Sequence, residues 1–279
     1  MKIFQKNHGK KTFIFLLIFL LLITFFSIYK LFIYMTPERM ASFPGSAQSE
    51  ETCESEIPDC QVCYLLNLDG MKGLGHSALL LIDETGAGQL FSYNGMQYGL
   101  LPCLLGKEGI GKMKVISMTP EETAVFLETG EPPASAFSTN EFDECRDFDR
   151  ILYRYITRNE FDTILSGTKG YIDAGDEFEK LYAAFHAPGN SESGRLSAES
   201  SMEAFLSQEQ LPKYQIYTHN CDTAARRLIA LIDPEAAAFN DTEASLFPKS
   251  NYKRMCRSLS EAWGFGPLGK DTWLEKLLQ

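Results

Sequence analysis

The chain has 279 residues, of which 44% are hydrophobic, 23% are charged and 12% are aromatic. This composition is typical of a folded protein and excludes a disordered, collagenous or low-complexity chain. The net charge is −11, but residues 1–34 hold five lysines and no acid, so the remaining residues carry −16. A domain with this negative charge repels the phosphate backbone of a nucleic acid, and no cluster of basic residues offsets the charge. Nucleic acid is therefore not an expected partner.

Residues 13–34 form a strongly apolar segment whose only charged residue is Lys30. A helix needs about 20 apolar residues to cross the hydrocarbon core of a membrane, so the segment predicts a transmembrane signal anchor. The lysines before it place residues 1–12 in the cytoplasm and the C-terminal domain outside, as in a single-pass cell-membrane protein. The alternative is a cleaved signal peptide, but the apolar run is long for one and no A-x-A cleavage site follows closely.

Cysteine usage agrees with export. In an exported protein most cysteines pair, and an odd number leaves one thiol over. The seven are Cys53, Cys60, Cys63, Cys103, Cys145, Cys221 and Cys256. Six of them can form three disulfides of unknown connectivity, with Cys221 as the expected odd one. Cys60-x-x-Cys63 has zinc or redox spacing, but no second C-x-x-C or H-x-x-H motif accompanies it, so neither a metal nor a cofactor is expected.

The rest of the chain predicts a linker over residues 35–60 and one folded domain over 61–279. The linker is rich in Ser, Glu and Pro, as solvated segments are. Strands are expected at 62–68, 76–82 and 89–93, the last two joined as a hairpin by the glycine-containing turn 84–88. A fourth strand at 114–118 leads into a helix that opens with the capping box of Thr119 and Glu122.

The second half repeats this strand-and-helix pattern. A strand at 149–156 precedes the capping box of Thr157 and Glu160, and residues 187–201 are a polar break within an insertion at about 173–212. A strand at 213–218 is followed by a helix that Asn220 caps and Pro234 ends. The pattern predicts the α+β class, with a mainly antiparallel sheet and helices packed beside it.

Chemistry-bearing residues concentrate in two segments. His76 follows Gly75 and precedes Ser77 at the start of a strand, and Cys221 follows Asn220 at the start of a helix. There the free backbone N–H groups and the helix dipole stabilise a thiolate and can receive an oxyanion. Besides His8 near the N-terminus, the candidate bases are His76, His186 and His219. His219 is poorly placed for proton transfer because it lies two residues from the thiol along an extended segment.

Structural roles for the same residues stay open. Cys221 can be a buried small hydrophobe or a disulfide partner, and Asn220 can be only a helix cap. His186 follows an apolar helical pattern and can interact favourably with the helix dipole at a helix end.

The order GHSALLLID, GQLFSYNG and then YQIYTHNCDTAARRLI resembles the circularly permuted NlpC-type branch of the papain-like cysteine hydrolases. That branch includes lecithin–retinol acyltransferase-like proteins and bacterial envelope proteins, and SLFPKSNY resembles the segment after their cysteine helix. The resemblance covers about residues 61–255 and implies a permuted papain-like domain.

The resemblance implies roles for individual residues. Cys221 matches the nucleophile and His76 the general base, while Ser92 and Asn94 occupy the strand that carries the third polar residue. Neither is the His often found there. Tyr217 matches an aromatic hydroxyl that helps hold the oxyanion, with Tyr214 as a substitute. The neighbours of the pair are expected to contact substrate: Gly75, Ser77, His219 and Asn220.

The implied activity is that of a membrane-anchored, extracytoplasmic cysteine hydrolase, an amidase or peptidase acting on cell-wall peptides. An acyltransferase or a lipid esterase or amidase on the same fold is the first alternative. The second is a non-catalytic binding module in which Cys221 is structural. A tethered structural or sensory protein ranks last, because residues 1–12 are too few to fold.

Overall fold

The computed structural model describes residues 15–25, 28, 38–42, 58–70, 75–95, 109–133, 147–209, 211–240 and 247–269. The chain divides into two compact units, one of residues 1–37 with 272–279 and one of residues 38–271.

The first unit contains a helix over residues 15–25, whose side chains are exposed. Among the residues that the structure describes, no helix is long and apolar enough to cross a membrane. The prediction of a transmembrane helix over residues 13–34 is therefore wrong. The extracytoplasmic location of the domain stays a prediction.

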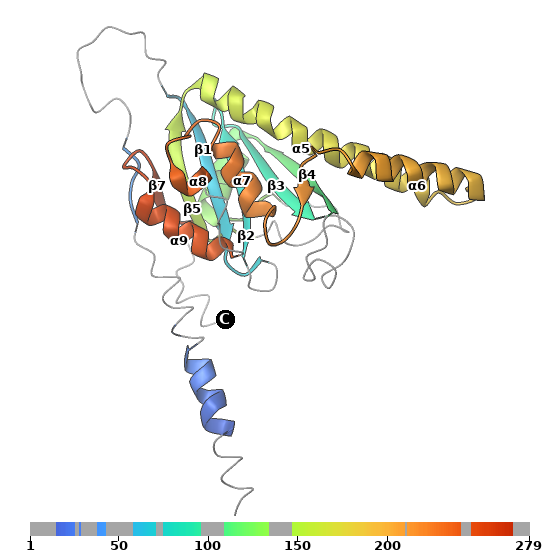
Figure 1. Ribbon diagram of the computed structural model, residues 1–279. Helices are drawn as coiled ribbons and strands as arrows, with labels where there is room; N and C mark the ends of the chain where they lie inside the picture. The colour runs from blue at the N-terminus through green and yellow to red at the C-terminus, as the bar shows by residue number, and fades with distance from the viewer. Residues whose placement is uncertain are drawn as a thin grey trace, which may run out of the picture. The chain divides into compact units, whose positions relative to one another are not determined.

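The second unit is an α+β domain built on one antiparallel sheet, with strand order β6-β4-β3-β2-β1-β5-β7 (Figure 1). The strands are β1 (Cys60–Asn67), β2 (His76–Ile82), β3 (Gly88–Gly95), β4 (Gly109–Met118), β5 (Arg150–Ile156), β6 (Lys213–Tyr214) and β7 (Gly264–Pro267). The strands predicted at 62–68, 76–82, 89–93, 114–118 and 149–156 are confirmed. The strand predicted at 213–218 shortens to two residues, because the chain turns at 215–219 before the next helix.

Local chemistry explains the hairpin of β2 and β3. The Asp83 carboxylate accepts hydrogen bonds from the backbone N–H groups of Thr85 (2.9 Å) and Ala87 (3.1 Å). Gly86 takes a φ of 87°, a left-handed conformation that disfavours most side chains. An Asp that folds back on its own backbone and a Gly with positive φ together close the turn.

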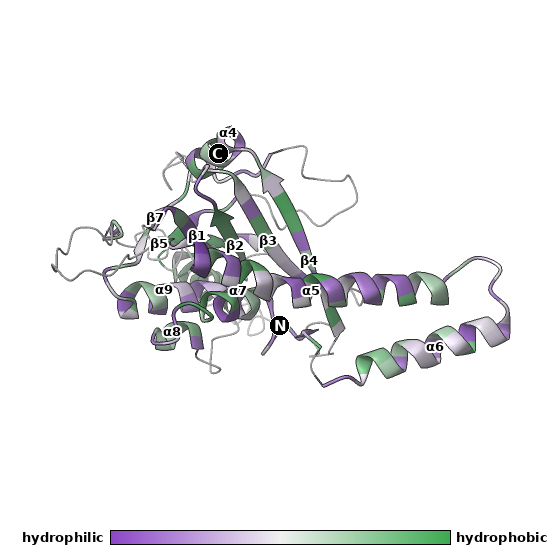
Figure 2. Cartoon of the chain, turned by 90° about the horizontal axis from the view of Figure 1, so that it is seen from above, coloured by the Kyte–Doolittle hydropathy of each residue, from purple (hydrophilic) through white to green (hydrophobic). Residues whose placement is uncertain are grey.

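The helices are α4 (Pro120–Thr129), α5 (Arg158–Phe185), α6 (Glu192–Leu206), α7 (Cys221–Ile229), α8 (Ala237–Asn240) and α9 (Pro248–Ser258). Both predicted capping boxes are present, at Thr119 with Glu122 and at Thr157 with Glu160. Figure 2 shows α4 on one side of the sheet and α5, α7, α8 and α9 on the other. The sheet is therefore covered on both faces.

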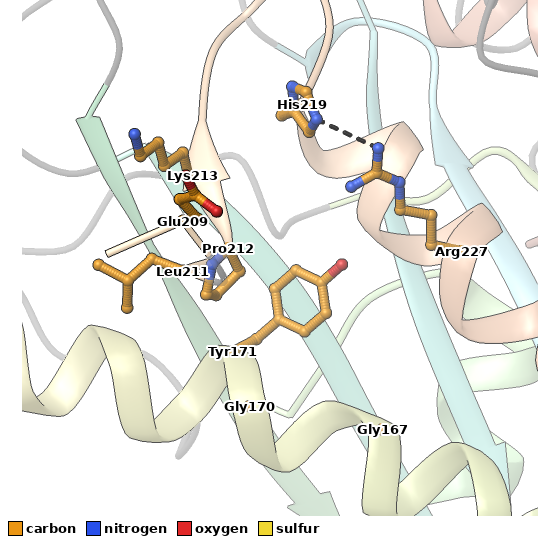
Figure 3. Close-up of a pocket in the computed structure, with 9 residues that line it drawn as sticks. All are labelled: Gly167, Gly170, Tyr171, Glu209, Leu211, Pro212, Lys213, His219 and Arg227. Carbon is orange, nitrogen blue, oxygen red and sulfur yellow. Dashed lines mark hydrogen bonds between the residues drawn. The ribbon is translucent and has the colours of Figure 1, made fainter. Parts of the chain in front are cut away.

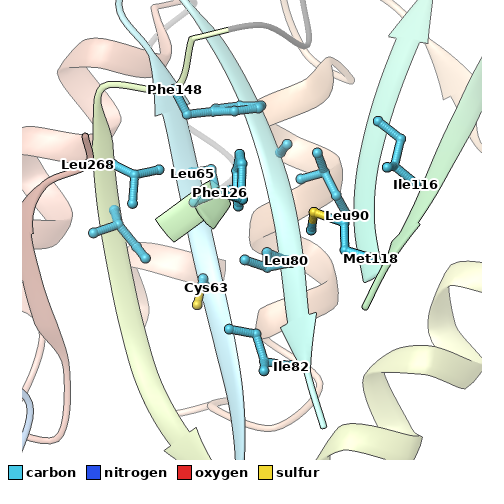
Figure 4. Close-up of a cluster of buried hydrophobic side chains, with 12 residues drawn as sticks. Cys63, Leu65, Leu80, Ile82, Leu90, Ile116, Met118, Phe126, Phe148 and Leu268 are labelled. Carbon is cyan, nitrogen blue, oxygen red and sulfur yellow. The ribbon is translucent and has the colours of Figure 1, made fainter. Parts of the chain in front are cut away.

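Alternating strand residues build these two faces. Cys63, Leu65, Ala78 and Leu80 point into an apolar cluster with Phe126 of α4 (Figure 4). Their neighbours Tyr64 and Ser77 point to the opposite face, where α7 packs against β1, β2 and β3. The start of α7 is thereby held over the start of β2.

Two segments differ from their sequence-based description. The insertion at 173–212 is a helical hairpin of the end of α5 with α6, and its polar break at 187–201 is mostly helix, because Ser191 caps α6. No α6 residue is buried. Within the expected linker 35–60, Arg39 pairs with Phe265 of the edge strand β7 through two backbone hydrogen bonds of 2.8 and 2.7 Å. This pairing covers part of a sheet edge.

Candidate active site

Cys221 is the first residue of α7 and is buried, with 3% of its surface exposed. The predicted cap is confirmed: the Asn220 side chain accepts a hydrogen bond from the Thr223 backbone N–H (3.1 Å). The Asn220 amide nitrogen donates to the Ile216 carbonyl (2.9 Å), which ties the cap to the preceding turn. Asn220 therefore places Cys221 where the free N–H groups of the first helical turn converge.

A buried polar network fixes this helix start to the sheet. The Tyr64 hydroxyl donates to one Asp222 oxygen at 2.6 Å and lies 2.6 Å from the Ser77 hydroxyl. The other Asp222 oxygen accepts from Arg226 (2.9 Å) and Asn251 (2.7 Å). Since Asp222 follows Cys221 and Ser77 follows His76, the network holds the two predicted catalytic segments together through their neighbours.

His76 belongs to a second buried group on β2 and β3. Its Nε2 lies 2.8 Å from the Ser92 hydroxyl, and the Asn94 amide nitrogen donates to the same hydroxyl at 3.2 Å. Nδ1 of His76 is buried without a hydrogen-bond partner among the described residues. Burial lowers the pKa of His76 to about 4, so the imidazole is neutral at physiological pH. His76, Ser92 and Asn94 are thus brought into direct contact.

The two buried polar groups lie on opposite faces of β2, because the side chains of consecutive strand residues point to opposite faces. Ser77 faces α7, whereas His76 faces Ser92. The vacant Nδ1 also means that the Cys221 thiol is not hydrogen-bonded to His76 here. Gly75, directly before β2, takes a φ of 96°, a left-handed conformation that favours glycine.

His219 lies in a different setting, at the edge of an open pocket (Figure 3). Its Nε2 is 3.1 Å from an Arg227 guanidinium nitrogen, which can only donate, and its Nδ1 is 2.8 Å from the Thr218 hydroxyl. Nε2 therefore faces a donor, and both ring nitrogens are engaged. His219 is not arranged to take a proton from Cys221.

The remaining predicted residues lie in other parts of the fold. Tyr217 lies in the turn before α7 with 43% of its surface exposed, and its substitute Tyr214 is buried beside Tyr93, with ring centroids 5.5 Å apart. His186 caps the C-terminus of α5, as its structural role predicts, and its ring lies 4.3 Å from that of Tyr182.

The four described cysteines carry thiols. Cys60 and Cys63 lie three residues apart on one strand and point to opposite faces, so they cannot form a dithiol or a shared metal site. Burial raises the pKa of both to about 12, and that of Cys256 to about 11, which makes all three unreactive. The expected partners Cys53, Cys103 and Cys145 lie outside the described residues.

Sequence reasoning missed the residues that position this site. Tyr64 and Asp222 are separated by 158 positions, and nothing local signals their contact. Gly70 was also missed: a Cβ there would lie 2.6 Å from the His76 Cβ, so only glycine lets this loop pack on the histidine. A sequence signal for this turn does exist, because an Asn followed three residues later by a Gly is typical of an Asx turn. In the structure the Asn67 side chain accepts hydrogen bonds from the backbone N–H groups of Asp69 and Gly70.

Comparison of the chain with models of known protein families, with curated proteins and with solved structures finds no match in any of the three.

Proposed function

We propose that this protein is a cysteine-dependent amide or ester hydrolase, with Cys221 as the nucleophile and His76 as the general base. One observation carries the proposal. His76 is buried with Nε2 held by Ser92 and Nδ1 left without a partner among the described residues, at the end of the strand to which the Cys221 helix is tied. A vacant, buried ring nitrogen costs free energy, and a catalytic role is one of the explanations for such a group in a folded protein.

The proposed reaction follows from these positions. Nε2–H donates to Ser92, so Nδ1 presents the lone pair that takes the thiol proton. The Cys221 sulfur attacks the substrate carbonyl, and the backbone N–H groups at the start of α7 stabilise the oxyanion. His76 then returns the proton to the leaving amine or alcohol. Water attacks the resulting thioester, again with His76 as base, and releases the acid and the thiol.

The neutral state of His76 decides how the thiol is activated. An imidazole whose pKa is about 4 does not form a resting ion pair with a thiolate at pH 7. The base therefore acts during attack, when substrate binding brings the thiol to Nδ1. Catalytic hydrogen bonds commonly tighten only once substrate is bound, which is the movement that this proposal requires.

Cell-envelope peptides are the proposed substrates, and lipid amides or esters come second. This order comes from the resemblance of the His76 and Cys221 segments to the permuted NlpC-type hydrolases, in which both substrate classes occur. An acceptor amine or alcohol in place of water would turn the same thioester into an acyl-transfer reaction.

The test is to trap the thioester. The full chain is incubated with p-nitrophenyl acetate, and the acetylated peptide is mapped by mass spectrometry before and after treatment with hydroxylamine, which cleaves thioesters. We expect a hydroxylamine-sensitive acetyl group on Cys221 that Cys221→Ser abolishes. Cys256→Ala is the matched control, because it removes another buried thiol and should leave the adduct unchanged. Acetylation only at lysines, or equally at Cys256, would reject the proposal.

A non-catalytic binding module is the second candidate, and one observation favours it. Ser77 and His76 point to opposite faces of β2, and the thiol is not hydrogen-bonded to the ring. In this case the polar groups only fix α7 on the sheet, and Cys221 resists acylation under all conditions. The same trapping experiment separates the two candidates.

A further inference from the structure

A pocket of about 520 Å³ lies between α5, the segment that leads into β6, and the start of α7. Its volume falls within the range of small-molecule sites, roughly 300–1,000 Å³. Gly167 and Gly170 of α5 form part of its wall, and no atom lies within 4 Å of where a Gly170 Cβ would stand. The space beside Gly170 is therefore open.

One side of the pocket is built around Arg227. Its guanidinium donates to His219 at 3.1 Å and lies beside the hydroxyl of Tyr171 (Figure 3). Burial raises the pKa of Tyr171, an effect that Arg227 partly offsets, so the hydroxyl stays protonated and can donate. No carboxylate among the described residues forms an ion pair with Arg227. Since a guanidinium presents five donors, this side has donors left over for an anion.

The opposite side of the pocket carries Lys213 and Glu209, which Figure 3 shows away from Arg227. The charged groups of the pocket are therefore separated, and the Arg227 side is cationic in a protein whose net charge is −11. An anion that reaches this side finds a planar fork of donors, the arrangement that matches a carboxylate.

The pocket lies next to the proposed nucleophile. His219 precedes Cys221 by two residues, and Arg227 follows it by six on the same helix, α7.

We propose that this pocket binds a carboxylate of the substrate through Arg227 and Tyr171. The substrate class is therefore an acidic peptide. That this peptide is also the molecule attacked by Cys221 rests on the proposed function, whereas the carboxylate site itself does not.

The test measures binding in the Cys221→Ala background, where no turnover takes place. The probes are acetyl-Ala-Ala-Glu amide and acetyl-Ala-Ala-Gln amide, which have the same shape and differ by one charge, and their dissociation constants are obtained by NMR titration. We expect the Glu peptide to bind about fivefold more tightly, the upper end for a solvent-exposed ion pair. Arg227→Gln should reduce this ratio to about one. Lys180→Gln removes the same charge from an exposed site on α5 outside the pocket and should leave the ratio unchanged.

A second variant tests the place of binding without altering charge. Gly170→Leu puts a side chain into the open space beside α5 and should weaken both peptides together. Three results would overturn the assignment. The two peptides could bind the Cys221→Ala protein with equal affinity, or Arg227→Gln could leave the ratio of their affinities intact. The third such result is that inorganic phosphate binds more tightly than the Glu peptide. If the ratio behaves as expected but p-nitrophenyl acetate never acylates Cys221 in the otherwise unaltered chain, the pocket stands and the proposed hydrolase falls.

Discussion

The β2 region, with His76, Ser92 and the Asp222 network, and the pocket region, with His219, Arg227 and Tyr171, use histidine in opposite ways. In the β2 region His76 is buried, one ring nitrogen is held by Ser92 and the other has no partner among the described residues. In the pocket region His219 is half-buried, and Arg227 and Thr218 engage both of its nitrogens. A buried ring nitrogen without a hydrogen-bond partner is suited to accepting a proton. A ring nitrogen that is already hydrogen-bonded is suited to positioning the side chain that it contacts. Chemistry is therefore assigned to the first region and recognition to the second.

The comparison also predicts which substitutions lower the stability of the protein and which lower its affinity for a ligand. The network around Asp222 and Arg226 in the β2 region has side chains that are 1% exposed. The pocket region borders solvent, so substitutions there expose few buried polar groups. Variants of the β2 region should cost stability, and variants of the pocket region should cost binding.

The largest effect is expected for Asp222→Ala. Removing this carboxylate leaves Arg226 buried without its charge partner, which costs about 3–5 kcal/mol in the free energy of unfolding. Urea denaturation measures the loss. The control is Glu177→Ala, which breaks an ion pair with Lys180 whose side chains are 50% and 72% exposed. That pair should contribute less than about 1 kcal/mol. Equal losses in the two variants would contradict the role given to the Asp222 network.

The next effect is a pH dependence that belongs to His76. Its pKa is about 4 in the folded protein and 6.5 in the unfolded chain. Between these values the unfolded state binds a proton that the folded state does not, so stability falls as pH drops from 6.5 to 4 and is fully restored above 6.5. The size of this contribution is about 3 kcal/mol.

His76→Phe should lack this part of the pH dependence, and His219→Ala should keep it. Urea titrations at pH 4.5 and pH 7 measure the difference for each protein. If the wild type and His76→Phe lose the same stability on acidification, His76 is not the buried neutral group described above.

The smallest effects come from two glycines, one in each region. Gly70→Ala brings a Cβ to 2.6 Å from the His76 Cβ and should destabilise by about 1–3 kcal/mol. Gly170→Ala meets no atom within 4 Å, and because it lies in α5 it should stabilise by up to about 1 kcal/mol. Thermal unfolding gives both values. A stabilising Gly70→Ala would show that the loop does not press on His76.

The sequence predicts this fold where its signals are local. The capping boxes at Thr119 and Thr157 each need two residues three positions apart, and the β2–β3 hairpin needs only Asp83 and Gly86 in its turn. His76 at a strand start and Cys221 at a capped helix start were predicted for the same reason. The pairing of Arg39 with Phe265 was missed, because a backbone contact at a sheet edge leaves no pattern in composition.

Other features depend on residues far apart in the chain. Tyr64 looks like any aromatic residue of a buried strand until the fold brings Asp222 to its hydroxyl. The transmembrane prediction was wrong for a different reason, since it rested on hydropathy alone, and no described helix is long and apolar enough to cross a membrane.

The central claim is that His76, and not His219, accepts the proton of Cys221. The most direct measurement is the rate of Cys221 acetylation by p-nitrophenyl acetate at pH 7 in the wild type, His76→Ala and His219→Ala. A general base contributes about 10²–10⁴-fold, so His76→Ala should slow acetylation by at least about 100-fold. His219→Ala should slow it less than about fivefold, because Arg227 and Thr218 already engage both nitrogens of that ring. A slower reaction in His219→Ala than in His76→Ala would contradict the account.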